Sequence, residues 1–508
     1  MPFPYRKPSP VAGGGPLGKL KEEAVAAGGG RGTFAQGPAA RYGALTLAAG
    51  PSEDITTNLN VPGSNGHTHT TARLHAKPAA RGRGRRGGIM AGLADGIPLN
   101  TAAFPLQPTG AADRIAVLDI LRGFALLGIG LMNMEAFSGP LDLSFTGIDP
   151  HWQGADYWAD AFVYVFVQGK FFTLFSLLFG AGFAVMAQRA QAGGRAFTPF
   201  YLRRSAALLL IGLCHALLVW SGDILVMYAL LSMALLACRE APRSWLPAMG
   251  VASYACGAAL VIVLAALLDQ LARTGSGPEA QQQAIQQARQ VIELQRQAYG
   301  QGSWSQAVVQ RARDLGAMLS GIFVIGPEVL GMFLIGSWFA RSGALAAPER
   351  FETLYRRLRW GALPAGLLLM LASALWRPYQ MPGTLDLAGG VAYAMGAVAG
   401  LLMCLGYLAW IVRARARLQW LAPAGRMALT HYIGQSLLCT ALFYGYGLGW
   451  FETVSRLWQV PLALGVFGAQ LAISHAWLRY FRFGPLEWAW RALTYLQWPP
   501  LRRVAAQD

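Results

Sequence analysis

Hydrophobic residues dominate the chain from Arg114 onward, in long runs separated by short polar segments. A helical run of about 20 apolar residues matches the hydrocarbon thickness of a bilayer. We therefore predict an all-α fold, a polytopic membrane bundle of about ten transmembrane helices. The expected spans are 115–137, 157–188, 202–220, 223–238, 245–268, 315–340, 360–376, 389–412, 427–449 and 460–478. The second span is over-long and contains VQGKFF, which predicts two pieces or a broken helix.

The first 113 residues follow a different pattern. Gly, Ala, Pro, Ser, Thr and Arg prevail, as in VAGGGPLGKL and RGRGRRGG, without apolar periodicity. Such a segment cannot bury enough apolar surface to offset the entropy of ordering, so we predict that 1–113 is a disordered extension. The basic run 81–86 is more typical of a solvated tail than of a nucleic-acid site, and no nucleic-acid partner is expected. A start at Met90 is the alternative, in which 1–89 would not belong to the natural product.

The remaining chain divides into three predicted parts. An N-terminal membrane bundle of about five spans covers 114–268, a Gln-rich extracytoplasmic loop covers 269–314, and a C-terminal membrane domain covers 315–508. The sequence GAVAG at 396–400 has GxxxG spacing, which predicts close helix packing. The five cysteines have neither CxxC nor Cys/His ligand spacing, so no disulfide and no metal site are predicted.

Composition and charge support this class and add an orientation. The chain is 54% hydrophobic and only 13% charged, whereas a soluble domain of ordinary composition carries about 25% charged residues. Arginines gather on alternate loops, which the positive-inside rule assigns to the cytoplasm. These cation-rich segments are 189–204, 239–243, 341–359, 413–426 and the tail after 478. The segment 269–314, with five arginines, is the exception, and long loops translocate largely regardless of their charge. We therefore expect a multi-pass protein of the bacterial inner membrane, with both termini cytoplasmic and the lipid bilayer as its first partner.

Ionisable residues within the predicted spans are the candidates for function. Each costs at least about 2.5 kcal/mol to insert, so it serves either a function or an ion pair within the bundle. Asp119 and Arg122 lie three residues apart on one helical face and are expected to pair, for packing or for substrate. The expected outer group is Asn133, His151, His215 and Asp223, the inner group is Arg122, Lys170, Arg426, His431 and Glu487, and Glu328 lies nearer the middle.

Five segments, taken in order, resemble the motifs of the YeiB family of bacterial inner-membrane proteins, whose C-terminal half is a domain of unknown function. They are LDILRGFALLGIGLMN, KFFTLFSLLFGAGF, GLCHALLVWSGDILVMYAL, GRMALTHYIGQS and FGPLEWAWRALTY. The resemblance extends from Arg114 to the end of the chain. The family often has Asn at the position of His431.

A more remote resemblance suggests a chemistry. Asp119, Arg122 followed by Gly123, and Asn133 are similar to the first-helix motif of the heparan-alpha-glucosaminide N-acetyltransferases, which move an acetyl group from cytoplasmic acetyl-CoA to a sugar across the membrane. The resemblance implies that His151, in HWQG, is a general base or transient acyl acceptor, although Gln153 stands where those enzymes have Asn. Asn133 would then donate to the developing oxyanion. Arg122, with Lys170 or Arg426, would hold the phosphates of acyl-CoA.

Three functions follow from these residues. The first is acyl transfer from cytoplasmic acyl-CoA, a co-substrate that is not bound tightly, to an extracytoplasmic glycan or lipid-linked acceptor. The second is a transporter or permease whose intramembrane ionisable residues relay protons or substrate. The third is a membrane assembly protein without turnover, in which every motif serves packing. The sequence indicates neither the acceptor nor the oligomeric state.

Overall fold

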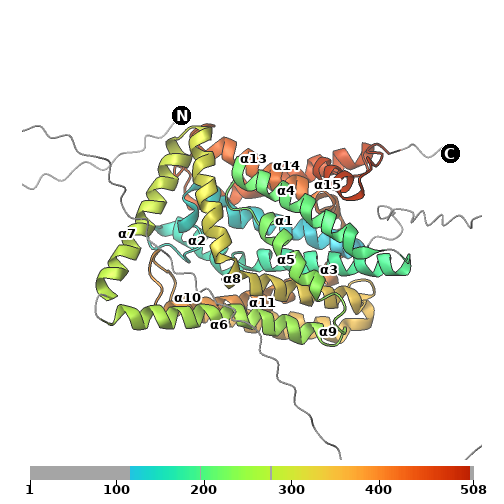
Figure 1. The fold of residues 1–508 in the computed structure, drawn as a ribbon, viewed down its shortest axis with the longest axis horizontal. Coiled ribbons are helices and arrows are strands. Elements are labelled where there is room, and N and C mark those ends of the chain that lie inside the picture. The colour runs from blue at the N-terminus through green and yellow to red at the C-terminus, as the bar shows by residue number, and fades with distance from the viewer. Residues whose placement is uncertain (1–114, 195, 275–276, 504–508) are drawn as a thin grey trace, which may run out of the picture. The chain divides into compact units, whose positions relative to one another are not determined.

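The computed structural model describes residues 115–194, 196–274 and 277–503 (Figure 1). Within these residues the chain is helical, and its only β-type pairings are isolated bridges between Gly147 and Tyr379 and between Phe481 and Arg502. The predicted all-α class is therefore confirmed. The predicted extension at 1–113 and the alternative start at Met90 lie outside the described residues.

The helices are connected by short turns and loops. The first eight are α1 (Ala116–Ser138), α2 (Gly154–Phe166), α3 (Lys170–Ala192), α4 (Phe197–Leu218), α5 (Leu225–Ala237), α6 (Leu246–Ala272), α7 (Gly277–Gln295) and α8 (Trp304–Arg341). They are followed by α9 (Glu352–Arg357), α10 (Leu363–Trp376), α11 (Leu387–Ala414), α12 (Ala422–Arg426), α13 (Ala428–Phe443), α14 (Arg456–Tyr480) and α15 (Pro485–Tyr495). Single turns of 3-10 or π geometry are η1 (Leu141–Leu143), η2 (Arg296–Gln301), η3 (Pro348–Phe351), η4 (Leu358–Ala362) and η5 (Gln419–Leu421).

Eight helical segments among the described residues are long and apolar enough to cross a membrane. They correspond to eight of the ten predicted spans. The other two, 223–238 and 427–449, correspond to α5 and α13, which have 13 and 16 residues. Helix α5 begins after a turn in which Asp223 accepts a hydrogen bond from the Val226 amide, 2.7 Å away, and α13 ends at Phe443, six residues before the predicted end of its span.

The predicted interruption of the second span is confirmed. Helix α2 ends at Phe166 and α3 begins at Lys170. The carbonyl oxygen of Val163 accepts from both Val167 and Gln168, each at 2.8 Å, in the last turn of α2. Gly169 then adopts a φ of 80°, a conformation that only glycine takes readily.

Helix α8 begins at Trp304, inside the segment predicted as an extracytoplasmic loop, and has 38 residues. Its start is fixed by a capping box, in which the Ser303 side chain accepts from the Gln306 amide and Gln306 reaches back to the Ser303 amide. The Gln-rich part of the same segment is helix α7. Secondary structure thus continues well beyond the apolar run that marked the span.

Close helix crossings occur at glycines other than the predicted pair. A Cβ atom at Gly180 on α3 or at Gly336 on α8 would clash with the backbone of the facing helix, so the two helices meet at van der Waals distance there. At Gly396 and Gly400, by contrast, an added Cβ would meet no atom within 4 Å. The GxxxG prediction for α11 is therefore wrong, because spacing creates a stripe of small residues but does not place a helix against it.

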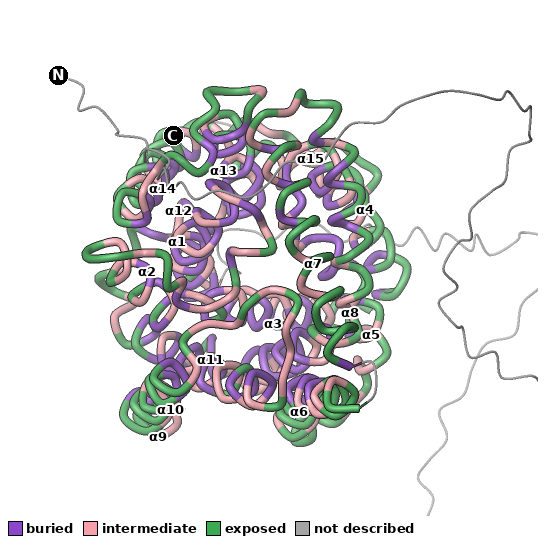
Figure 2. Tube along the Cα trace, turned by 90° about the vertical axis from the view of Figure 1, so that its left-hand side faces the viewer, coloured by how far each residue is buried: buried purple, intermediate pink, exposed green. Residues whose placement is uncertain are grey.

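Helix α1 lies inside the bundle and α6 at its periphery (Figure 2). In the apolar windows of these helices, 72% of α1 is buried but only 28% of α6. The outward face of α6 exposes Val263, Leu267 and Leu271, as expected for a surface in contact with lipid. Helix α1 instead packs against α3, α12, α13 and α14. The polar residues of α1 therefore face protein and not lipid.

Candidate functional site

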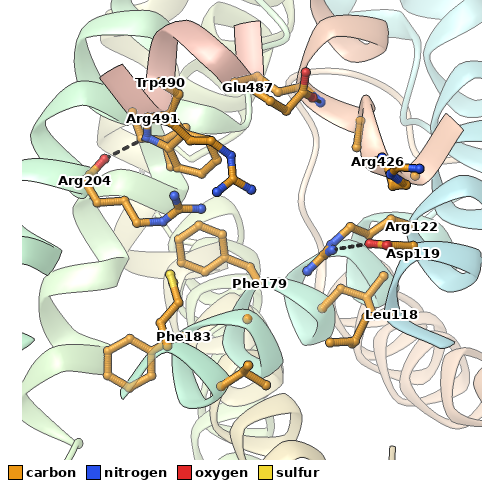
Figure 3. Close-up of a pocket in the computed structure, with 18 of the residues that line it drawn as sticks. Leu118, Asp119, Arg122, Phe179, Phe183, Arg204, Arg426, Glu487, Trp490 and Arg491 are labelled. Carbon is orange, nitrogen blue, oxygen red and sulfur yellow. Dashed lines mark hydrogen bonds and ion pairs between the residues drawn. The ribbon is translucent and has the colours of Figure 1, made fainter. Parts of the chain in front are cut away.

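One cavity collects charged residues from both halves of the chain. It has a volume of about 290 Å³ and is bounded by α1, α3, α4, the start of α5, the α12–α13 region and α15. Its walls are mostly apolar and aromatic. The charged lining consists of six arginines and two carboxylates: Arg122, Arg189, Arg204, Arg426, Arg482, Arg491, Asp119 and Glu487. Figure 3 shows the guanidinium groups of Arg122, Arg204 and Arg491 directed toward the same space.

Helix α1 provides the first wall. The predicted pair forms there, with Arg122 Nη1 donating to Asp119 Oδ1 at 2.9 Å. A Cβ atom at Gly425 would clash with the carbonyl oxygen of Asp119, so glycine allows α12 to cross α1 at this point. This crossing places Arg426, the residue after Gly425, in the same cavity as Arg122.

Helix α15 provides the opposite wall by docking on α4. The guanidinium of Arg204 stacks over the Trp490 ring, 3.5 Å from its centroid, and Trp490 Nε1 donates to the Arg204 carbonyl oxygen at 3.0 Å. Stacking of this kind holds the planar guanidinium in one orientation while its N–H edge stays available to an anion. Arg491, next in sequence, also lines the cavity.

Glu487 joins α15 to the start of α13. Its carboxylate accepts from the Leu429 and Thr430 amides at 2.7 and 3.1 Å and from the Thr430 hydroxyl at 2.6 Å. These donors stabilise the charged form, yet burial is the larger effect and raises the pKa of Glu487 above its ordinary value. Glu487 therefore fixes α15 against the start of α13 at the edge of the cavity.

A buried histidine–aspartate pair lies behind the cavity wall. His215, near the end of α4, approaches Asp223 with 2.7 Å between Nδ1 and Oδ2, and both residues are 2% exposed. The His215 ring packs beside Tyr432, with 5.1 Å between ring centroids, and Tyr432 lines the cavity. The Tyr432 hydroxyl contacts the loop that carries Asp223, accepting from the Ile224 amide at 3.2 Å.

Three other predicted residues lie deep in the bundle but do not line this cavity. Lys170 donates from Nζ to the Tyr164 carbonyl oxygen at 2.8 Å, across the break between α2 and α3. Glu328 accepts from the Tyr393 hydroxyl at 3.2 Å, and His431 forms a hydrogen bond with the Ser474 hydroxyl. Each of these has a partner within the bundle.

The two residues predicted to be catalytic also lie elsewhere. Asn133 is buried, 5% exposed, toward the C-terminal end of α1. His151 lies in an exposed loop, where its Nδ1 is 2.7 Å from Asp149 Oδ1. Neither side chain lines the arginine cavity. Their catalytic roles stay predictions, whereas Asp119, Arg122, Arg426 and Glu487 are brought together in one site.

Sequence reasoning missed most of the cavity's cations. Arg204, Arg482 and Arg491 lie near span ends, where the positive-inside rule already explained them. Trp490 carried no local signal, because the arginine that stacks on it, Arg204, is 286 residues away in sequence.

A second polar network was also missed. Arg456 at the start of α14 is 1% exposed and donates to Asp160 Oδ1 at 2.8 Å and to Glu135 Oε2 at 3.1 Å. It also donates to the Gln459 side chain at 2.7 Å. These contacts join α1, α2 and α14. They pair a fully buried guanidinium, so removal of its acceptors would leave an uncompensated buried charge.

The fold and the cavity define a helical membrane protein with an arginine-lined internal site. The family model described as "Protein of unknown function (DUF418)" matches residues 339–497, from the end of α8 through α15. The chain is 37% identical over 413 residues to "Uncharacterized protein YxaH" of Bacillus subtilis (strain 168), covering 78% of this chain and 98% of the relative. It is 33% identical over 398 residues to "Uncharacterized protein YeiB" of Escherichia coli (strain K12), covering 75% and 96%. The chain belongs to this YeiB-like family, whose C-terminal part is the DUF418 domain.

Proposed function

We propose that this protein is an inner-membrane acyltransferase that takes an acyl group from cytoplasmic acyl-CoA and passes it to an extracytoplasmic glycan or lipid-linked acceptor. The observation that carries the proposal is the lining of the cavity, in which six arginines face only two carboxylates within apolar walls. This combination suits a ligand with several phosphates and an apolar arm. Arginine suits phosphate because its planar fork donates two parallel hydrogen bonds.

The direction of the cavity supports a cytoplasmic donor. The charged lining lies at the beginnings of α1 and α4 and at the end of α3, as in Asp119, Arg204 and Arg189. The positive-inside rule assigns these helix ends to the cytoplasm, with both chain termini on the same side. An acyl-CoA would therefore enter from the compartment in which it is made.

The size of the cavity suggests which part of the donor it holds. At about 290 Å³ the cavity lies at the lower edge of the range for ligand pockets, roughly 300 to 1,000 Å³. A cavity of this volume fits the narrow acyl-bearing arm of the donor better than its whole nucleotide. We therefore place the phosphates among the arginines at the mouth and the thioester toward the apolar interior. Asn133 remains the proposed oxyanion donor on the acceptor side, whereas the exposed His151 lies outside this cavity.

Transport of an organic anion is the second candidate. The broken helix between α2 and α3, with the buried Lys170 ammonium at the break, is a feature of many transporters. In that case the arginine cavity would be one end of a transport path, and the anion would leave unchanged on the other side.

Proteoliposomes separate these functions. The purified full chain is reconstituted, supplied with [¹⁴C]acetyl-CoA on the arginine-rich side, and mixed with a bacterial envelope glycan extract. Acyl transfer predicts radiolabelled glycan and release of CoA thiol in equal amounts, both of which depend on the protein. Labelled solute inside the vesicles without thiol release would establish transport instead. If neither acyl transfer nor solute uptake occurs, both proposals are refuted and an assembly role is supported.

A further inference from the structure

The buried His215–Asp223 pair lies at the apolar end of the arginine cavity. The deepest lining residues along their helices are Phe175 on α3, Leu208 on α4 and Tyr432 on α13, and they carry no charge. Ile224 and Leu225, which follow Asp223 directly, also line the cavity. At about 1.5 Å rise per residue, His215 lies about 21 Å along α4 from Tyr201 near the mouth. The Tyr432 ring separates His215 from the cavity, so this ring must turn aside for an acceptor hydroxyl to come within hydrogen-bond reach of Nε2.

The far nitrogen of His215 has no partner. Its Nδ1 contacts Asp223, but its Nε2 is buried without a hydrogen bond to any described residue. The indole Nε1 of Trp220 is also buried and without a hydrogen-bond partner among these residues, and the two rings lie 6.4 Å apart between centroids. Buried polar atoms without partners are rare, and each requires an explanation such as a ligand or a catalytic role.

We propose that His215 is the general base of acyl transfer and that Asp223 is the residue that positions it; this inference rests on the proposed acyltransferase function. Asp223 accepts the Nδ1 proton, which leaves Nε2 as the lone-pair nitrogen. The other carboxylate oxygen, Oδ1, accepts from the Val226 amide at 2.7 Å and thereby fixes the carboxylate at the start of α5. Both partners are thus held by helix ends of the scaffold.

The other described histidines lack this combination. The Nε2 of His431 forms a hydrogen bond with the Ser474 hydroxyl, and the Nε2 of His475 forms one with the Trp420 carbonyl oxygen at 3.0 Å. His151 has an aspartate partner but its side chain is 85% exposed. In the part of the chain that the structure describes, His215 alone combines burial, a carboxylate partner and an unpartnered nitrogen.

The proposed step conserves atoms and charge. Nε2 of His215 takes the proton from a hydroxyl of the acceptor while the hydroxyl oxygen bonds to the thioester carbonyl carbon. The resulting tetrahedral oxyanion collapses and breaks the bond between carbon and sulfur. The CoA thiolate leaves and takes the proton from Nε2. The products are an ester of the acceptor and the free thiol of CoA, and His215 returns to its starting form.

Two substitutions test this role in the reconstituted full chain. His215→Gln removes the base, and Asp223→Asn removes the carboxylate charge while its amide oxygen can still accept from Val226. His475→Gln is the matched control, since His475 is exposed and does not line the cavity. We measure CoA affinity by titration, and acyl transfer from [¹⁴C]acetyl-CoA to the glycan extract.

If His215 is a catalytic base, its replacement should slow acyl transfer and leave CoA affinity nearly unchanged. His215→Gln should bind CoA within about twofold of the wild type, and its transfer rate should fall by about 10² to 10⁴-fold, the usual contribution of a positioned base. The double variant His215→Gln/Asp223→Asn should lose no more of the transfer rate than His215→Gln alone, because the two residues act as a unit. Transfer by His215→Gln at the His475→Gln rate would overturn the inference. So would equal losses of CoA affinity and turnover, which indicate a structural role.

The two proposals fail in different ways. A wild-type protein that binds no CoA refutes the acyl-CoA site and the proposed function with it. A wild-type protein that transfers acetyl groups while His215→Gln transfers equally well refutes only the general base. If His215→Gln does not fold, Asp223→Asn decides the question by the same comparison of CoA affinity with transfer rate.

Discussion

Two histidine–aspartate pairs have the same distance between ring nitrogen and carboxylate oxygen, but one pair is buried and the other is exposed to water. The separation between Nδ1 and the carboxylate oxygen is 2.7 Å in both His215–Asp223 and His151–Asp149. The side chains of the first pair are 1% and 0% exposed, whereas those of the second are 85% and 21% exposed. Water screens the exposed pair and competes for its hydrogen bonds, so such a contact contributes about 0 to 1 kcal/mol. The comparison teaches that the same hydrogen-bond distance can join a pair that is shielded from water or a pair that water screens.

The two aspartates also differ in what they hold. Asp149 accepts from the amide and the ring of His151, two residues away, which stabilises one local turn. Asp223 joins the end of α4 to the start of α5 and borders the cavity through Ile224. The buried pair is therefore built into the scaffold around the site, and the exposed pair belongs to its loop.

The largest expected difference is in acyl transfer. We expect the loss caused by His215→Gln to exceed that caused by His151→Gln by at least about tenfold, because a desolvated, oriented base is worth about 10² to 10⁴-fold. The measurement is the rate of CoA thiol release from acetyl-CoA with the glycan extract, at matched protein content. A greater loss at His151 would instead return the catalytic role to the outer loop.

Stability should separate the two aspartates next. Asp223→Ala leaves the buried imidazole N–H and the Val226 amide without their acceptor, and each buried donor left unsatisfied costs about 1 to 3 kcal/mol. Asp149→Ala should cost less than about 1 kcal/mol. Melting of the detergent-purified proteins, followed by tryptophan fluorescence, checks both values. Equal melting temperatures would show that burial does not distinguish the pairs.

The sequence was sufficient for the class of fold and for part of the site. Hydrophobic run length predicted the membrane helices, and VQGKFF predicted the break between α2 and α3. Helical spacing predicted the pairing of Asp119 with Arg122, since residues three apart share a face. Arg426 and Glu487 also stood out, because both are charged residues close to apolar runs.

The rest depended on contacts that local pattern does not encode. Arg204 and Trp490 are 286 residues apart in sequence, and Arg456 and Asp160 are 296 apart. Apolar periodicity shows that a helix is buried but not which helix it meets. His215 was a candidate from the start. Its partner, its unpartnered Nε2 and its place behind Tyr432 became visible only with the helices packed.

The most direct test of the account is the affinity of the cavity for CoA. Arg204→Gln removes a guanidinium that lines the cavity, and Arg356→Gln removes an exposed one on α9 that does not. A charge-assisted hydrogen bond contributes about 1.5 to 3 kcal/mol, so the account predicts that Arg204→Gln weakens CoA binding by about 10 to 100-fold and that Arg356→Gln changes it by less than about twofold. Equal affinities of the two variants, or wild-type protein that does not bind CoA, would contradict it.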